Sequence, residues 1–197
     1  MKPIMLDLCA GFGGQSEAFL KGGYDVVRVD NNPLLSEVPN MFIADLNTIE
    51  PFNLSGEVID YIHASPPCLE FSTAFDAPRS KAYRRGEAWR PQSSIQFVER
   101  CKHIIDTLQP RYWSIENVRG SIKYLKPLLG EPRLIVGAYV YWGNFPLFEI
   151  DSTILPMKSE KDKRHSPLRA NYRAHIPLEL SQAFFDAMTK QHSILDY

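Results

Sequence analysis

The sequence predicts an α/β fold in which a mostly parallel sheet carries helices on both faces. Three observations predict it: apolar runs that end in polar or Pro-containing turns, helical periodicity between some of these runs, and a Gly-rich turn after the first run. The chain has 197 residues, of which 44% are hydrophobic and 12% aromatic. This length suits one well-packed domain and is tight for two, so residues 1–197 are expected to form a single domain.

The N-terminal segment is predicted to form a strand, a tight turn, a helix and a second strand. Ile4 to Leu8 is a short apolar run that leads into the Gly-rich segment 9–14. Residues 16–20 have a composition that favours a helix. The run 24–29 then alternates small apolar residues up to Asp30, which predicts a strand with an acid at its tip. Together these elements predict a βαβ unit.

Further strands are expected in the rest of the chain. The runs 41–44, 58–64 and 112–115 are apolar and end near polar residues. Residues 134–142 are rich in β-formers, and 145–150 are expected to pair with them as a hairpin across Gly143-Asn144. The ends of parallel strands are where open α/β sheets place their chemistry.

Two helices and two irregular segments complete the prediction. Apolar residues recur at helical spacing in 95–108, and a closing amphipathic helix begins near Pro177. Residues 69–94 lack an amphipathic period and carry five basic residues, so they are expected to form a long mobile loop over the site. Residues 156–175 form a second basic segment, predicted to be irregular.

Global properties exclude some classes of protein. A net charge of −1 gives no overall basic footprint, so any nucleic-acid binding must use local clusters. The N-terminus is too short for a signal peptide before the Gly-rich turn, and no apolar run reaches membrane-spanning length, so a cytoplasmic location is expected. The three cysteines have unrelated spacings, which fit neither a disulfide framework nor a zinc site, and no metal is expected.

Reactive side chains occur at two of the predicted strand ends. Cys68 follows two prolines, which restrict the backbone and remove two amide donors. A thiolate attacks an electron-poor ring carbon well, so Cys68 is a candidate nucleophile, although a lone cysteine is commonly a small buried hydrophobe. Glu116 is a candidate partner or a solvated acid. The Gly-rich turn with Asp30 is typical of nucleotide sites, in which backbone approaches the ligand and a carboxylate accepts ribose hydroxyls.

Three ordered segments resemble the motifs of the DNA cytosine-C5 methyltransferase family. They are Asp7 to Gly14, Pro66-Pro67-Cys68 with Phe71-Ser72, and Glu116-Asn117-Val118. The resemblance covers roughly residues 4–120. It implies a Rossmann-like, S-adenosylmethionine-dependent methyltransferase fold, S-adenosylmethionine as the cofactor, and transfer of a methyl group to C5 of cytosine in DNA.

The resemblance also implies roles for individual residues. Cys68 would add to cytosine C6, and Glu116 would hydrogen-bond the ring N3 and the exocyclic amine. Asp30 would bind the cofactor ribose and Asp45 its adenine amine. The other implied cofactor contacts are Cys9, Ala10, Gly11, Phe12, Gly13, Gly14, Asn31 and Pro67. The expected substrate contacts are Ser72, Arg79, Arg84, Arg85, Asn117 and Val118. The target base must be flipped out or already unpaired.

The chain departs from the family pattern in several places. Cys9 and Asn31 stand where aromatic residues are usual, and Leu69-Glu70 replaces the usual Gln after the nucleophile. Neither a Gln-x-Arg-x-Arg segment nor a closing Gly-Asn-Ser/Ala segment is found. In the family, the arginine of the first segment assists at the target base, and its candidate substitutes in this chain are Arg133, Arg164 and Arg169.

The remaining sequence leaves no room for a separate target-recognition domain. Base readout needs several side chains directed into a groove, so we expect low sequence specificity, a very short recognition site, or recognition by a partner chain. Two alternatives therefore stay open. The substrate is RNA or a free cytidine nucleotide, or the chain is a non-catalytic or partner-dependent subunit of a split methyltransferase.

Overall fold

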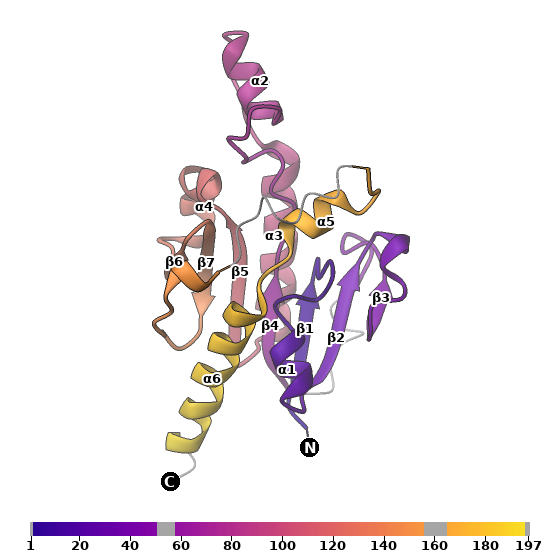
Figure 1. Cartoon of the computed structure of the whole chain (residues 1–197), viewed down its shortest axis with the longest axis vertical. Coiled ribbons are helices and arrows are strands. Elements are labelled where there is room, and N and C mark those ends of the chain that lie inside the picture. The colour runs from indigo at the N-terminus through magenta and orange to yellow at the C-terminus, as the bar shows by residue number, and fades with distance from the viewer. Residues whose placement is uncertain (1, 51–57, 156–164, 196–197) are drawn as a thin grey trace.

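Seven strands form one sheet in the order β3-β2-β1-β4-β5-β7-β6 (Figure 1). The computed structural model describes residues 2–50, 58–155 and 165–195. The strands are β1 (Ile4–Leu8), β2 (Asp25–Asp30), β3 (Met41–Ile43), β4 (Ile59–Ala64), β5 (Tyr112–Val118), β6 (Leu134–Val136) and β7 (Tyr139–Asn144). The first five pair in parallel, whereas β7 runs antiparallel to both β5 and β6. This is the Rossmann-like α/β arrangement that the sequence predicts.

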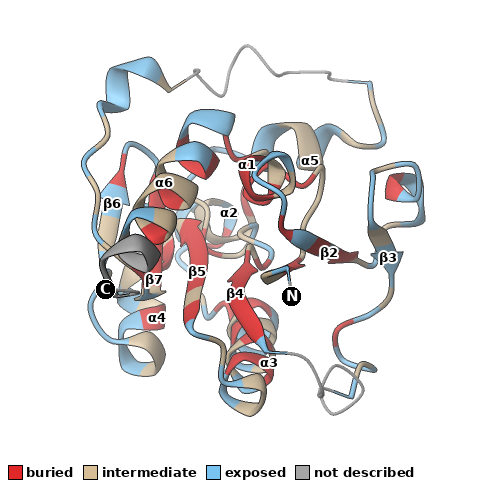
Figure 2. Cartoon of the chain, turned by 90° about the horizontal axis from the view of Figure 1, so that it is seen from below, coloured by how far each residue is buried: buried red, intermediate tan, exposed pale blue. Residues whose placement is uncertain are grey.

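Helices cover both faces of the sheet, as predicted (Figure 2). One face packs against α3 (Gln92–Leu108) and α4 (Ile122–Leu129) through an aliphatic core. The opposite face packs against α1 (Glu17–Lys21) and α6 (Leu178–Leu195) through a core that is rich in aromatic rings. The other helices are α2 (Pro78–Arg84), α5 (Arg169–Ala174) and the 3₁₀ turns η1 (Pro33–Leu35), η3 (Arg119–Ser121) and η4 (Ser152–Ile154).

The alternation of side chains along β1 explains how one strand serves both cores. Leu6 and Leu8 belong to the core under α3, whereas Met5 belongs to the core under α6. Both faces of a central parallel strand are covered, so such a strand is apolar nearly throughout. Asp7 is the exception, because its carboxylate is buried on the side of α1.

Helix α3 begins earlier than its apolar period indicates. The period predicts residues 95–108, and the helix starts at Gln92. It ends where Gln109 adopts a left-handed φ of 46° and donates its backbone N–H to the Ile105 carbonyl. Pro110 follows directly and cannot continue the helix.

The predicted hairpin across Gly143-Asn144 is wrong. Strands β6 and β7 pair instead across the two residues that follow Val136, because Gly137 takes a φ of +56° that a tight two-residue turn requires. Gly143 lies inside β7, where a Cβ atom would come within 2.1 Å of the Trp113 carbonyl oxygen of β5. A glycine is needed there for close strand packing and not for a turn.

Two segments predicted to be irregular contain helices. Within 69–94, Pro78 starts α2, which projects away from the sheet, and Gln92 already belongs to α3 (Figure 1). Proline suits a first helical position, and a seven-residue helix is too short to show an amphipathic period. Within 156–175, the structure forms α5, while residues 156–164 lie outside the described residues. The single-domain organisation stays a prediction.

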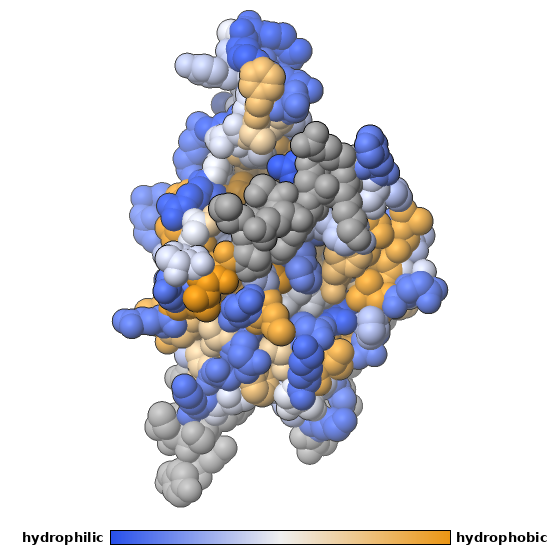
Figure 3. Space-filling model, viewed as in Figure 1, coloured by the Kyte–Doolittle hydropathy of each residue, from blue (hydrophilic) through white to orange (hydrophobic). Residues whose placement is uncertain are grey.

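The edge strand β3 leaves apolar side chains in contact with solvent. Leu34, Phe42 and Ile43 are exposed, and hydrophobic residues gather over this edge at the right of Figure 3.

None of the described helices combines the length and apolar character needed to cross a membrane.

Phe184 attaches α6 to the sheet. Its side chain is 1% exposed, and its ring centroid lies within 5 Å of those of Tyr141, Phe145 and Phe148. The substitution Phe184→Ala is expected to lower the free energy of unfolding by about 3–5 kcal/mol, because it leaves a cavity in the aromatic core. Urea unfolding measures the change. The control Leu178→Ala, at an exposed position of the same helix, should cost much less, and equal losses would contradict this packing.

Candidate functional site

The candidate site lies where the sheet changes its direction of growth. From β1 the chain builds outward through β2 to β3, and then returns to add β4 on the other side of β1. Open α/β sheets bind their ligands at such a switch point, beyond the carboxyl ends of the strands. The Gly-rich turn follows β1 there, and the Ser65 N–H donates to the Leu8 carbonyl at 3.0 Å. The strand pairing therefore places Gly11 to Gly14 beside Ser65 to Cys68.

Backbone conformation and one carboxylate shape the Gly-rich turn. Cys9, Gly11 and Gly13 take φ angles of 55°, 54° and 73°, which glycine adopts most readily. The Gly11 N–H donates to Asp30 Oδ2 at 2.9 Å, and the Asn32 N–H donates to Asp30 Oδ1 at 3.0 Å. Asp30, at the end of β2, is thus attached to the turn and remains partly exposed.

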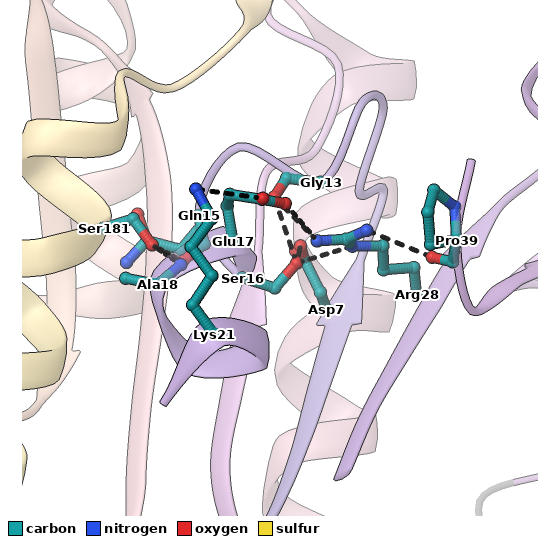
Figure 4. Close-up of polar contacts among 10 residues, drawn as sticks. All are labelled: Asp7, Gly13, Gln15, Ser16, Glu17, Ala18, Lys21, Arg28, Pro39 and Ser181. Carbon is teal, nitrogen blue, oxygen red and sulfur yellow. Dashed lines mark hydrogen bonds and ion pairs between the residues drawn. The ribbon is translucent and has the colours of Figure 1, made fainter. Parts of the chain in front are cut away.

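A buried polar cluster supports the turn from below (Figure 4). Ser16 Oγ donates to Asp7 Oδ2 at 2.6 Å, and Arg28 Nε donates to Ser16 Oγ at 2.9 Å. The guanidinium also reaches the Gly13 carbonyl at 3.3 Å and Glu17 Oε2 at 3.1 Å. Burial raises the pKa of Asp7 to about 6, against the opposing effects of the Ser16 hydrogen bond and the Arg28 charge.

Helix α6 holds the other end of the turn. Ser181 Oγ donates to the Gln15 carbonyl at 2.6 Å and accepts the Ala18 N–H at 3.0 Å (Figure 4). Ser181 is fully buried, so these bonds are shielded from water. A residue more than 160 positions along the chain from the turn therefore helps to define its shape.

The Cys68 segment forms a second turn at the end of β4. The N–H groups of Phe71 and Ser72 both donate to the Cys68 carbonyl, at 3.1 and 3.0 Å. Asn117 Nδ2 donates to the Pro66 carbonyl at 3.1 Å from β5. Asn117 is one of the predicted substrate contacts, and this bond gives its side chain a structural role, because it braces the turn that carries the thiol. Cys68 itself is partly exposed.

Glu116 lies beside this turn and is buried. Ala64 of β4 pairs with Ile115 of β5, so Ser65 and Glu116 each lie one residue beyond that pair. Glu116 is 8% exposed and pairs across the sheet with Tyr141. The negative charge at Glu116 adds to burial in raising the pKa of Tyr141. The structure thus brings both predicted catalytic residues to the carboxyl edge of adjacent strands.

A continuous hydrogen-bonded network runs beneath the two turns, and the sequence did not indicate it. His63 Nε2 lies 2.8 Å from Ser65 Oγ, and His63 Nδ1 lies 2.7 Å from Ser114 Oγ. Ser114 Oγ lies 2.6 Å from the Tyr61 hydroxyl, which accepts a hydrogen bond from Gln15 Nε2 at 3.3 Å. This network connects Gln15, directly after the Gly-rich turn, with Ser65 at the start of the Cys68 turn.

The thiol of Cys9 differs from that of Cys68. Its contact with Cys101 and its burial raise the pKa of Cys9 well above the ordinary value for a thiol. Cys101 is fully buried on the apolar face of α3, as its spacing predicts. A protonated thiol is a weak nucleophile, so Cys9 is a poorer candidate for the attacking group, and its predicted contact with the cofactor stays a prediction.

The other predicted cofactor residues surround the turn. Asn31 and Pro67 are exposed, and Asp45 is exposed two residues beyond β3. Asp45 Oδ1 accepts the Asn47 N–H at 2.9 Å. Asp30 is partly exposed at the Gly-rich turn, and Asp45 lies two residues beyond Ile43, the strand partner of Asp30. Carboxylates suit the hydroxyls and the amine of a nucleoside.

Helix α5 closes one side of the Gly-rich turn, which the sequence did not predict. The Tyr172 ring centroid lies 4.7 Å from that of Phe12, and Asn171 Oδ1 accepts a bond from Asn32 Nδ2 at 3.4 Å. A Cβ atom at Gly14 would come within 2.9 Å of the His175 ring. Only the tertiary packing brings this basic C-terminal segment to the site.

The three arginines among the expected substrate contacts make bonds within the chain. Arg79 Nη1 donates to the carbonyls of Phe71 and Gly120, at 3.2 and 3.1 Å, and so joins the Cys68 segment to the segment after β5. Arg84 Nη1 donates to the Phe75 carbonyl, and Arg85 forms an ion pair with Glu87. Of the smaller predicted contacts, Ser72 Oγ accepts the Ala74 N–H, and the Val118 N–H donates to the Asn117 side chain.

The proposed substitutes for the absent arginine motif are only partly described. Arg133 Nε donates to the Phe145 carbonyl at 2.7 Å, and its guanidinium lies over the Phe145 ring. Arg169 begins α5, which packs beside the Gly-rich turn. Arg164 lies outside the described residues. Arg133 is therefore engaged in the hairpin region, and Arg169 is the one nearer to the site.

Comparisons with family models, curated proteins and solved structures each gave a match. A family model for C-5 cytosine-specific DNA methylases matches residues 4–126. The type II methyltransferase M.DdeI of Desulfomicrobium norvegicum is 27% identical over 150 residues, which is 68% of this chain and 34% of that protein. The chain thus spans about a third of the length of the curated relative it matches. A solved DNA modification methyltransferase from an E. coli prophage matches 72% of this chain and 46% of its own, with a TM-score of 0.47 and 18% identity.

Arg28 leaves no space for a side chain at Gly13. A Cβ atom there would come within 2.1 Å of Arg28 Nε, whereas nothing lies within 4 Å of the corresponding position at Gly23, which also has a positive φ. Gly13→Ala should therefore cost about 1–3 kcal/mol more stability than Gly23→Ala in urea unfolding. Equal losses in the two variants would mean that backbone strain alone requires glycine.

The buried His63 predicts a pH-dependent contribution to stability. Burial lowers the pKa of His63 to about 3, below its ordinary 6.5, so the unfolded chain takes up a proton that the folded chain excludes. The contribution of neutral His63 to the free energy of unfolding is complete above about pH 6.5 and declines as the pH falls toward 3. At pH 7.5, His63→Gln should be less stable by about 1–3 kcal/mol.

The pH dependence separates His63 from Asp7. Asp7 has a raised pKa, so its contribution is present below about pH 4 and declines as the pH rises through about 6, opposite in sign to that of His63. Asp7 contributes equally to the free energy of unfolding of wild type and of His63→Gln, so its effect cancels in the difference between the two. This difference should narrow between pH 6.5 and 4 in urea unfolding, and a constant difference would show that His63 is not neutral in the folded protein.

Proposed function

This chain belongs to the C-5 cytosine-specific DNA methylase family, and on that premise we propose that it methylates C5 of cytosine in DNA through a covalent bond to Cys68. The observation that carries the proposal is the placement of Cys68 and Glu116 at the ends of adjacent strands, beside the Gly-rich turn. A cytosine ring at this edge would meet a thiol and a carboxyl group together.

The residues around the Gly-rich turn suit S-adenosylmethionine as the cofactor. Gly11 to Gly14 would bring backbone close to the ligand, Asp30 would accept the ribose hydroxyls, and Asp45 would accept the adenine amine. Phe12, held against Tyr172, would line the side of this site. When bound, S-adenosylmethionine supplies an electrophilic methyl group.

Cys68 and Glu116 would activate the cytosine. The Cys68 thiolate would form a bond to C6, which shifts electron density to C5 and makes that carbon nucleophilic. Glu116, in its carboxylic acid form, would donate a hydrogen bond to N3 as negative charge develops on the ring. C5 would take the methyl group that the cofactor supplies, which leaves S-adenosylhomocysteine. Loss of the C5 proton to water would then restore the C5–C6 double bond and expel Cys68 as a thiolate. The brace from Asn117 to Pro66 would hold the sulfur in position during these steps.

The length of the chain bears on its substrate and partners. The chain spans about a third of the length of the curated relative that it matches, so the activity of that longer protein does not by itself establish the activity of this chain. A chain that acts alone would accept cytosine in DNA with little sequence preference. Methylation of RNA or of free cytidine nucleotides, and activity only with a partner chain, are the alternatives that the experiment below distinguishes.

Trapping tests the covalent step. DNA that contains 5-fluorocytosine cannot lose the C5 substituent, so wild-type protein with S-adenosylmethionine should form a stable adduct, detected by mass spectrometry on the peptide that contains Cys68. Cys68→Ala should form none. Cys101→Ala is the matched control, because it removes a buried thiol on α3 and should retain adduct formation.

Parallel reactions with RNA and with 5-fluorocytidine monophosphate identify the substrate. An adduct on RNA or nucleotide but not on DNA would move the proposal to that substrate. An adduct that persists in Cys68→Ala, or none on any of the three substrates, would overturn the enzymatic proposal for the chain by itself. In the second case, adding a candidate partner subunit tests the split-enzyme alternative.

A further inference from the structure

A second surface feature lies beside the Cys68 turn, between the segment that carries α2 and helix α4. It is an open groove of about 470 Å³. The residues that matter for its chemistry are Arg79, Tyr83, Arg84, Trp89, Lys123 and Tyr124. The surroundings of α2 are largely hydrophilic, as the upper part of Figure 3 shows. The groove therefore combines basic and aromatic side chains on an exposed projection.

The basic residues of the groove keep uncompensated charge. Arg79 and Arg84 donate to backbone carbonyls, which leave the guanidinium charge in place. Within the described part of the chain, neither they nor Lys123 forms an ion pair with a carboxylate. Glu87, the acidic residue of the lining, is already paired with Arg85 at 2.8 Å. The groove thus attracts anions such as phosphates.

Three aromatic residues line the groove, and one of them, Tyr83, is open to solvent. Tyr83 is 84% exposed, which is unusual for so large a ring. Tyr124 has the Arg79 guanidinium 5.5 Å and the Lys123 ammonium 4.6 Å from its ring centroid. Trp89 is held in place by a bond from Nε1 to the Glu70 carbonyl at 3.0 Å. Aromatic faces interspersed with cations are typical of surfaces that bind unpaired nucleic-acid strands.

Short links connect the groove with Cys68. Arg79 binds the carbonyl of Phe71, whose own N–H donates to the Cys68 carbonyl. Trp89 binds the carbonyl of Glu70, two residues after Cys68. The groove and Cys68 therefore belong to one hydrogen-bonded segment of the chain.

We propose that the groove between α2 and α4 binds unpaired nucleotides of the DNA strand that carries the target cytosine. The inference rests on the proposed function and extends it to the form of the substrate. Phosphate contacts alone would serve a duplex equally well, but stacking on the exposed ring of Tyr83 needs a base face that a duplex keeps covered. The groove thus favours a locally opened or single-stranded DNA substrate.

Binding measurements test this proposal independently of catalysis. Fluorescence anisotropy with a labelled single-stranded DNA and with the duplex of the same sequence gives two dissociation constants for the full chain. Wild type should bind the single strand more tightly. Tyr83→Ala should weaken single-strand binding about fivefold or more, the usual loss for one stacked base, whereas Tyr83→Phe should retain it. Leu147→Ala, at another exposed apolar residue, is the control and should have no effect.

Salt dependence tests the charge. Lys123→Gln should reduce the slope of log affinity against log salt by about 0.7, the value for one phosphate contact on a single strand. Lys126→Gln is the matched control on the same helix, since Lys126 is exposed and pairs with Glu131. Unchanged affinities and slopes in all variants, equal binding of duplex and single strand, or no binding by wild type would each overturn the proposal. A Cys68 adduct formed normally alongside such a result would show that the proposed function stands without this groove.

Discussion

The parallel pairing of β1 with β4 is the constraint on which the candidate site depends. These strands are separated by β2 and β3 in the chain, and their pairing joins the Gly-rich turn to the Cys68 turn. Because both strands run in the same direction, their carboxyl ends open on the same edge of the sheet. Adding β5 beside β4 then places Glu116 next to Ser65, at the start of the Cys68 turn. The site therefore follows from strand order more than from any single contact.

The sheet carries an unusual number of polar groups directly under this edge. Asp7, Arg28, His63 and Ser114 are buried, and each would be costly without a hydrogen-bond partner. The structure supplies partners in two groups, one centred on Arg28 under the Gly-rich turn and one centred on His63 under the Cys68 turn. Buried networks of this kind hold backbone in one geometry when every member is satisfied. The two networks therefore hold the Gly-rich turn and the Cys68 turn in fixed positions.

The segment between Cys68 and α3 links the Cys68 turn to a second surface. Arg79 connects it to the end of β5, and Trp89 connects it back to the residues after Cys68. These bonds make the α2 projection part of the same structural unit as the Cys68 turn. Under the proposed function, contacts made by a strand in the groove would be transmitted over a few residues to the thiol.

Local patterns in the chain predicted β1, β4, the apolar face of α3 and the motifs around Cys68 and Glu116, because strand and helix periods and short motifs depend on neighbouring residues. The position of the hairpin was predicted wrongly, since Gly143 serves close packing against Trp113 and Gly137 makes the turn. The roles of distant residues were beyond such patterns. That Arg79 bonds to carbonyls, that α5 covers the Gly-rich turn and that His63 connects two turns depend on pairs of residues far apart in the chain. Only folding brings those atoms within hydrogen-bonding distance, so their partners had to be observed in three dimensions.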